Sequence, residues 1–119
     1  MQLTERDLWW IAGFLEGEGS FDMASRSQRI HAAQVNPEPI LKLQKLVGGK
    51  IYEIIPTSSF SKNPQQHWHL GGEPARELMV LLYPLMSAKR QEQIITALKQ
   101  RESAHDALVA VIKGPQTCA

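Results

Sequence analysis

Hydrophobic and polar positions at the start of the chain predict a helix with an unusual surface. Residues 8–15 are apolar without a polar side, and Thr4 and Asp7 before them are typical of a helix cap and first turn. A surface helix keeps one polar face, so a helix that lacks one must be covered on opposite sides. We therefore predict a helix from about residue 5 to about residue 16, packed on its own domain and on the same helix of another copy.

The remainder of the chain predicts short strands and further helices. The predicted strands span residues 20–26, 30–35, 50–55 and 66–70. Asn36 and Pro37 predict the start of a helix that stops at Gly48 and Gly49. Further helices are expected near residues 73–83, from Ser87 onward with Ile94, Ile95 and Leu98 inward, and from residue 103. The hairpin between the first two strands is expected to turn at Ser27 and Gln28.

Two carboxylates stand between glycines where the first predicted helix ends. Glu16 and Glu18 add negative charge to a helix end that is already negative, which is unfavourable unless a cation compensates. Carboxylate and carbonyl oxygens suit a hard cation such as Mg²⁺. Gly13 and Gly17, one turn apart, permit a second helix to approach closely. About a two-fold axis, two copies of Glu18 would converge; alternatively, both acids are simply solvated at a turn.

The segment from Ile11 to Gly19 resembles the nine-residue motif of the LAGLIDADG homing endonucleases, and the Ser20 and Phe21 that follow are also typical of that family. Family members with one motif act as homodimers, and we find a single copy here. The resemblance implies an α+β fold: an αββαββα core whose curved four-stranded antiparallel sheet is packed on one face by helices. The other sheet face would be free to lie along DNA.

The resemblance also implies an activity, namely sequence-specific cleavage of double-stranded DNA with a pseudo-palindromic target, in an intron-encoded homing endonuclease. Glu18 and the Gly17 carbonyl would hold Mg²⁺ for hydrolysis of the phosphodiester bond. Lys89 matches a family lysine that projects toward the active site and stabilises charge on the phosphate. The residues expected at the dimer interface are Trp9, Ala12, Gly13 and Glu16. Pro37 departs from the family, since well-known members use a polar side chain near this position.

Period-two alternation and the resemblance together select the side chains expected on the DNA face. Trp68 and Leu70 should be inward, which places His67 and His69 outward. The second strand is assigned by resemblance, with Ala32 also outward, and this assignment points Arg29 and His31 inward. The expected DNA contacts are Asp22, Ala24, Arg26, Gln28, Ile30, Gln34, Lys50, Tyr52, Lys62, His67 and His69. For the two histidines, polar contacts are favoured over zinc because no other ligand stands nearby.

Composition is compatible with this interpretation. The 119 residues predict one domain over 1–119, with a core of about 4–102 and a C-terminal helix or tail over 103–119. The net charge is only +1, but residues 20–70 hold six basic against three acidic residues. The single cysteine, Cys118, favours a reducing compartment, and no secretory signal or membrane span is seen, so we expect a soluble intracellular protein.

Two other functions remain open from the sequence. A non-cleaving maturase that binds DNA or RNA, or a transcriptional regulator, would keep the helix and the sheet on the same scaffold. A dimeric domain that binds no nucleic acid would use residues 17–19 only as a turn. Nucleotide binding is disfavoured because these glycines follow a helix end, whereas phosphate cradles lie at helix starts. Acids that meet at a dimer axis would favour the nuclease.

Overall fold

The computed structural model describes residues 2–55 and 63–99, and its elements follow the predicted order. They are α1 (Glu5–Glu18), β1 (Gly19–Ala24), β2 (Ser27–Gln34), α2 (Pro37–Val47), β3 (Lys50–Ile54), β4 (Gln65–Gly71), α3 (Glu73–Leu82) and the 3₁₀ turn η1 (Tyr83–Leu85). Residues 88–99 form a further helix. Lys62, Cys118 and the helix predicted from residue 103 lie outside the described residues.

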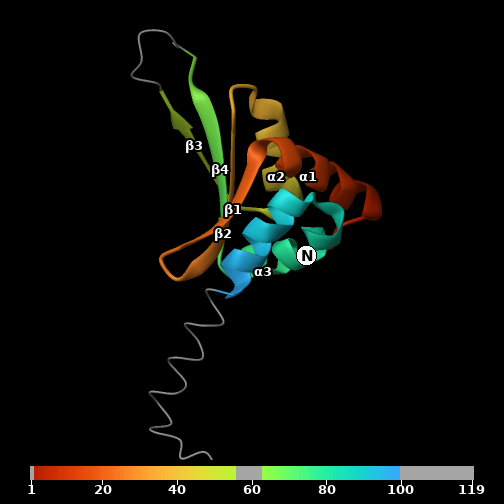
Figure 1. The fold of residues 1–119 in the computed structure, drawn as a ribbon. Coiled ribbons are helices and arrows are strands. Elements are labelled where there is room, and N and C mark those ends of the chain that lie inside the picture. The colour runs from red at the N-terminus through yellow and green to blue at the C-terminus, as the bar shows by residue number, and fades with distance from the viewer. Residues whose placement is uncertain (1, 56–62, 100–119) are drawn as a thin grey trace, which may run out of the picture.

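The strands form one antiparallel sheet in the order β1-β2-β4-β3. Figure 1 shows α1, α2, α3 and the helix of residues 88–99 on the same side of this sheet, and within residues 2–55 and 63–99 no helix lies on the other face. The predicted α+β class and αββαββα order are therefore confirmed. Because helices cover only one face, alternate residues of every strand are left on an open face.

Local signals explain where the helices begin and end. Thr4 and Asp7 form a reciprocal capping box at the start of α1, and the Asn36 side chain accepts from the Glu38 N–H at the start of α2. Gly49 follows α2 with φ of 103°, and a Cβ there would lie 2.5 Å from Trp68 Nε1. Only glycine fits this position, which allows the chain to turn from the end of α2 directly into β3.

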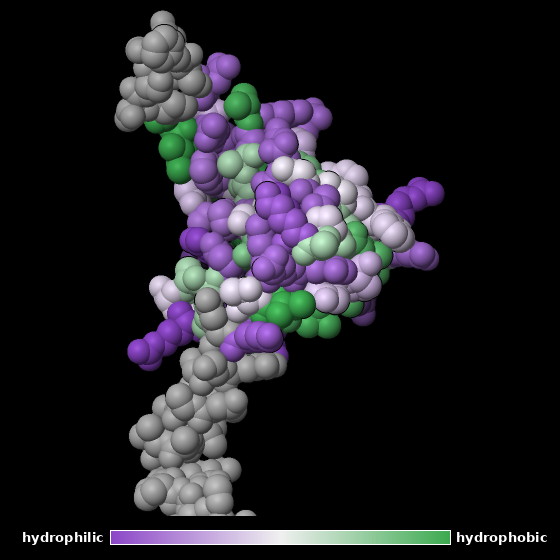
Figure 2. Space-filling view, viewed as in Figure 1, coloured by the Kyte–Doolittle hydropathy of each residue, from purple (hydrophilic) through white to green (hydrophobic). Residues whose placement is uncertain are grey.

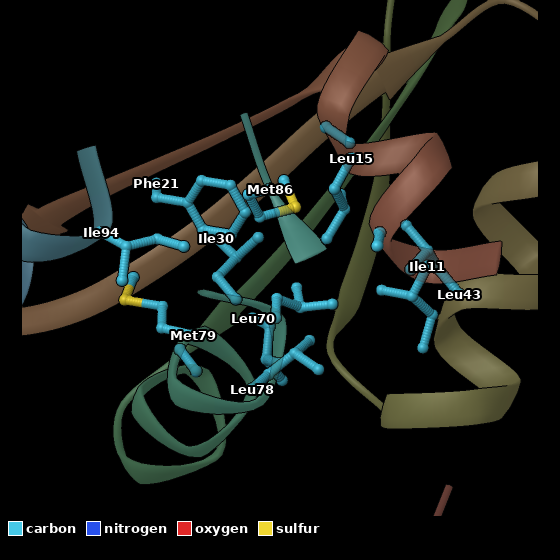
Figure 3. Packing of buried hydrophobic residues seen from close by; sticks show 14 of the residues in the cluster. Ile11, Leu15, Phe21, Ile30, Leu43, Leu70, Leu78, Met79, Met86 and Ile94 are labelled. Carbon is cyan, nitrogen blue, oxygen red and sulfur yellow. The ribbon is translucent and has the colours of Figure 1, made fainter. Parts of the chain in front are cut away.

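The core lies between the sheet and its helices. Figure 3 shows Phe21, Ile30 and Leu70 of the strands among Leu15 of α1, Leu78 and Met79 of α3, and Ile94. Trp68 is completely buried, and its Nε1 donates to the Gly48 carbonyl at 2.8 Å. Ile94 is buried as predicted, but Ile95 is 37% exposed, because the sheet-facing side of this helix continues through Ala97 instead. The inward prediction for Ile95 is therefore wrong.

The β1–β2 hairpin turns two residues earlier than predicted. Ser25 and Arg26 form the turn with φ of 51° and 65°, a left-handed conformation that suits the twist of a two-residue hairpin. Arg26 consequently lies in the turn and not within a strand. Strand β2 begins at Ser27, so the predicted turn at residues 27–28 is wrong.

The side-chain orientation of β2 is also opposite to the prediction. Ile30 pairs with Phe21 and Leu70, and Ala32 pairs with Trp68, so both point toward the helices. Three further features follow the same alternation: Gln28 is fully buried, Gln34 opposes Gln66 on the helix side, and Arg29 and His31 face outward. The outward predictions for Gln28, Ile30, Ala32 and Gln34 are wrong. Burial of Gln28 is tolerated because its Nε2 donates to the Ala97 carbonyl at 3.3 Å.

Most of the surface on the side shown in Figure 2 carries hydrophilic residues, with smaller hydrophobic areas between them. The exposed hydrophobic side chains of α3 are Val80 and Leu81. Within residues 2–55 and 63–99, every helix is either too short or too polar to cross a lipid bilayer.

Candidate active site and nucleic-acid interface

Helix α1 has two different sides. Its buried side chains are Ile11, Ala12 and Leu15. On the opposite side Trp9 is 55% exposed, and Gly13 and Gly17 follow it at intervals of four residues. A Cβ added at either glycine would meet nothing within 4 Å. We call Gly13 and Gly17 the small-residue stripe; together with the exposed Trp9 before it, it forms a side of α1 that another helix could approach closely.

Two residues expected at a dimer interface have another role within the subunit. Ala12 is only 3% exposed, since it packs into the core of its own domain. Glu16 contacts Ser87 and Arg90, which lie at the start of the helix of residues 88–99. Within the subunit Ala12 is thus buried and Glu16 is bound to the next helix, whereas Trp9 and Gly13 are exposed, and the assignment of these four residues to a dimer interface stays a prediction.

Glu16 joins the end of α1 to the helix that carries Lys89. Its carboxylate accepts from the Ser87 N–H at 2.6 Å and from the Ser87 hydroxyl at 2.8 Å, and its main-chain carbonyl accepts from Arg90 Nε at 3.1 Å. The Ser87 N–H is the main cause that lowers the pKa of Glu16 below its ordinary value. An anion at a helix start is also favoured by the helix dipole. The contact joins the last turn of α1, which ends at Glu18, to the first turn of the helix that carries Lys89.

Substitution of Glu16 is expected to weaken this contact between α1 and the helix of residues 88–99. Glu16→Ala should lower the free energy of unfolding by about 1 kcal/mol at neutral pH, because a partly exposed cap is screened by solvent. A lowered folded-state pKa stabilises the fold above the ordinary value of 4.5, and this part is lost as the pH falls through the lowered value. Denaturant unfolding at neutral pH and at about pH 3 should show the difference between native and variant chains shrinking with acid.

Glu16→Gln is the matched control for that experiment. It retains an acceptor for Ser87 but not the ionisable group. Its free energy of unfolding should therefore lie between those of Glu16→Ala and the native chain. It should also lack most of the pH dependence that the ionisable Glu16 gives to the native chain. Equal stability of Glu16→Ala and the native chain at neutral pH would contradict the role of Glu16 as a cap.

Glu18 is the last residue of α1, and its side chain is exposed. It makes no ion pair or side-chain hydrogen bond with residues 2–55 or 63–99. In the same part of the chain, the Gly17 carbonyl receives no hydrogen bond from outside α1. A carboxylate and a carbonyl at the negative end of a helix are hard oxygen donors that fit Mg²⁺ chemically. No cluster of three or more acidic, histidine or cysteine ligands occurs within the described ranges.

The open sheet face brings together side chains from all four strands. The predicted face is confirmed for Asp22, Ala24, Lys50, Tyr52, His67 and His69. Two residues of β2 join them although they were predicted inward, namely Arg29 and His31. Their polarity was the signal that could have revealed this, because a charged group pointing into an apolar core is costly.

Arg29 and Asp22 form a pair across β1 and β2. Arg29 Nε donates to Asp22 Oδ1 at 2.9 Å and Nη2 donates to Oδ2 at 2.7 Å, while His31 Nε2 lies 3.3 Å from the same Oδ2. The Arg29 guanidinium thereby lowers the pKa of Asp22, and Asp22 raises that of Arg29. This two-point contact holds the guanidinium in one orientation on the open face.

Lys89 is exposed in the first turn of its helix, beside a cleft between that helix and β1. Asp22 and Met23 of β1 line the cleft together with Glu92 and Gln93. The cleft therefore connects the helix that carries Lys89 to the strand that carries Asp22, one of the open-face residues.

Comparison of the chain with protein-family models and with curated proteins finds no match to either.

Proposed function

We propose that this protein is a homodimeric, single-motif endonuclease of the LAGLIDADG type that cleaves double-stranded DNA by divalent-metal-assisted hydrolysis. The observation that carries the proposal is the position of Glu18. It is an exposed carboxylate, without an ion pair in residues 2–55 and 63–99, at the end of a helix whose small-residue stripe is open to a second helix. The exposed Trp9 and the open space at Gly13 and Gly17 on the same side of α1 are compatible with a second helix packing there.

The dimer is proposed to form about a two-fold axis along the small-residue stripe. In such an interface the same residues meet from both subunits, so Gly13 and Gly17 of one chain would face those of the other. The absence of side chains at both glycines permits close packing of the two α1 helices. Since Glu18 follows directly, the two carboxylates would arrive at a shared centre.

Both subunits contribute residues to the proposed reaction. Glu18 of each chain, with the Gly17 carbonyl, would hold Mg²⁺, which when bound supplies a Lewis acid and an activated water. Lys89 would contact the scissile phosphate and offset its developing charge. Glu16 would act by position only, since its bonds to Ser87 hold Lys89 relative to Glu18.

The open sheet face is proposed to lie along the DNA. A curved antiparallel ribbon can enter the major groove, where an arginine reads guanine and neighbouring polar groups contact phosphates. Arg29 is already oriented by Asp22, so less conformational freedom is lost when it binds. Lys50 and the three histidines of the same face provide further donors.

Selection from a randomised duplex library tests this proposal. The native chain is incubated with the library in Mg²⁺ or in EDTA, and bound and cut molecules are sequenced separately. We expect one pseudo-palindromic site enriched in both bound fractions, with cut ends only in Mg²⁺. A bound site that is never cut would favour the maturase or regulator on this scaffold. Failure to enrich any sequence would favour the dimeric domain that binds no nucleic acid.

A further inference from the structure

Three histidines and a tyrosine meet on the open face of the sheet. They come from three adjacent strands: His31 from β2, Tyr52 from β3, and His67 and His69 from β4. Tyr52 Oη lies 2.6 Å from His69 Nε2. The ring centroids of Tyr52 and His69 are 5.0 Å apart, those of Tyr52 and His67 5.5 Å, and those of His31 and His69 5.7 Å. We call these four residues the histidine cluster.

We infer that the histidine cluster is a proton-dependent contact for DNA phosphate, so that association with DNA takes up protons and strengthens as the pH falls. This inference rests on the proposed function, because it concerns the same sheet face. Histidine is the side chain whose ordinary titration lies nearest neutral pH, and its protonated ring carries two donors for anions. Three such rings within one patch make the charge of the face depend on pH.

The surrounding charges oppose protonation in the free protein. Asp22 of β1 lies near His31, but its carboxylate is already bound by Arg29 of β2. From β3, Lys50 opposes His69 in register. Partial burial lowers the pKa of His69, and the nearby Arg29, His31 and His67 lower it further, against a smaller opposite effect of Asp22. In the free protein these surroundings therefore disfavour the protonated form of His69.

A DNA phosphate would reverse this balance. Its negative charge stabilises protonated imidazoles and compensates their mutual repulsion, so the histidine pKa values rise in the complex. A ligand that prefers the protonated form binds more tightly as the pH falls through the range between the free and bound pKa values. The affinity for DNA is consequently expected to increase from neutral to mildly acidic pH.

The bond between Tyr52 and His69 adds a second effect. When His69 Nε2 carries no proton, it accepts from the Tyr52 hydroxyl. When the ring is protonated, Nε2–H donates to Tyr52 Oη, and the hydroxyl hydrogen is released to point elsewhere. A single proton thus supplies both a positive charge and an additional donor for a phosphate oxygen.

The experiment measures binding of the native chain to a mixed-sequence duplex in EDTA, where no cleavage is expected, at constant salt. Fluorescence anisotropy should give an affinity about tenfold higher at about pH 5.5 than at about pH 7.5. The slope of log affinity against log salt should also steepen at the lower pH, by about one for each histidine that gains a phosphate contact. His69→Gln should reduce the tenfold ratio to about threefold or less.

Two variants and one titration distinguish the effect of histidine protonation from other effects on DNA binding. Lys50→Gln removes a fixed charge from the same face, so it should weaken binding at both pH values while the affinity stays higher at the lower pH. Tyr52→Phe keeps the ring but loses the hydroxyl, so it should reduce the ratio in part. Nuclear magnetic resonance titration of the unsubstituted chain should show imidazole pKa values rising when the duplex is added, which requires no variant to fold.

Equal affinity at both pH values, or a ratio that survives the double variant His31→Gln and His69→Gln, would overturn the inference while leaving DNA binding intact. Imidazole pKa values that stay unchanged in the complex would overturn it as well. Absence of binding at either pH would instead refute the proposed function on which the inference rests.

Discussion

Glu18→Gln is expected to bind the selected DNA site with nearly native affinity but to cleave it at least about a thousandfold more slowly in Mg²⁺. The substitution preserves size and removes the negative charge that a hard cation requires. Because Glu18 is exposed and forms no ion pair within residues 2–55 and 63–99, the fold should not depend on its charge. Single-turnover cleavage and anisotropy measured on the same duplex check both parts of the prediction.

The matched control is Glu53→Gln, which neutralises another exposed carboxylate, on strand β3. It should cleave at close to the native rate. If Glu18→Gln lost binding together with cleavage, Glu18 would be structural. If it cut as fast as the native chain, the assignment of the metal ligand would be wrong.

Gly13→Leu is expected to convert the dimer into a monomer while making each subunit slightly more stable. Because a side chain at Gly13 meets nothing within 4 Å in its own subunit, the variant gains helix propensity of about 0.5–1 kcal/mol. Across the proposed axis, however, two leucines would separate the α1 helices. The dissociation constant of the dimer should rise at least about a hundredfold, which corresponds to about 2.7 kcal/mol, and cleavage should disappear with it.

Sedimentation equilibrium and thermal unfolding separate these two effects. Lys45→Leu adds the same side chain to an exposed position of α2, and it should leave the oligomeric state unchanged. A native chain that sediments as a monomer at all concentrations would contradict the dimer, with or without DNA. So would a Gly13→Leu variant that dimerises as tightly as the native chain.

The capping residues show which features could be predicted from local sequence. Thr4 and Asp7 begin α1, Asn36 begins α2, and the glycines after residue 47 end it, as predicted. These signals act over three or four residues, so each can be recognised in the sequence without knowledge of the rest of the fold. The alternation around Trp68 was equally clear, and His67 and His69 were placed on the correct face.

Strand β2 shows where local reasoning failed. Its sequence alternates between Gln28, Ile30 and Ala32 on one side and Arg29 and His31 on the other, and the resemblance selected the wrong side. The hairpin turn at Ser25 and Arg26 contains no glycine, so its position has little local signal. Pairing of Ile30 with both Phe21 and Leu70 settles the orientation, and that pairing is not local.

The order of the elements, the helix caps and the acid at the end of α1 follow from the sequence alone, because each depends on neighbouring residues. Contacts between residues about seventy positions apart required the tertiary structure: Glu16 binds Ser87, and Gln28 binds the Ala97 carbonyl. The histidine cluster likewise exists only after three strands have paired. No local rule specifies such neighbours, since they are fixed by the packing of the whole sheet against its helices.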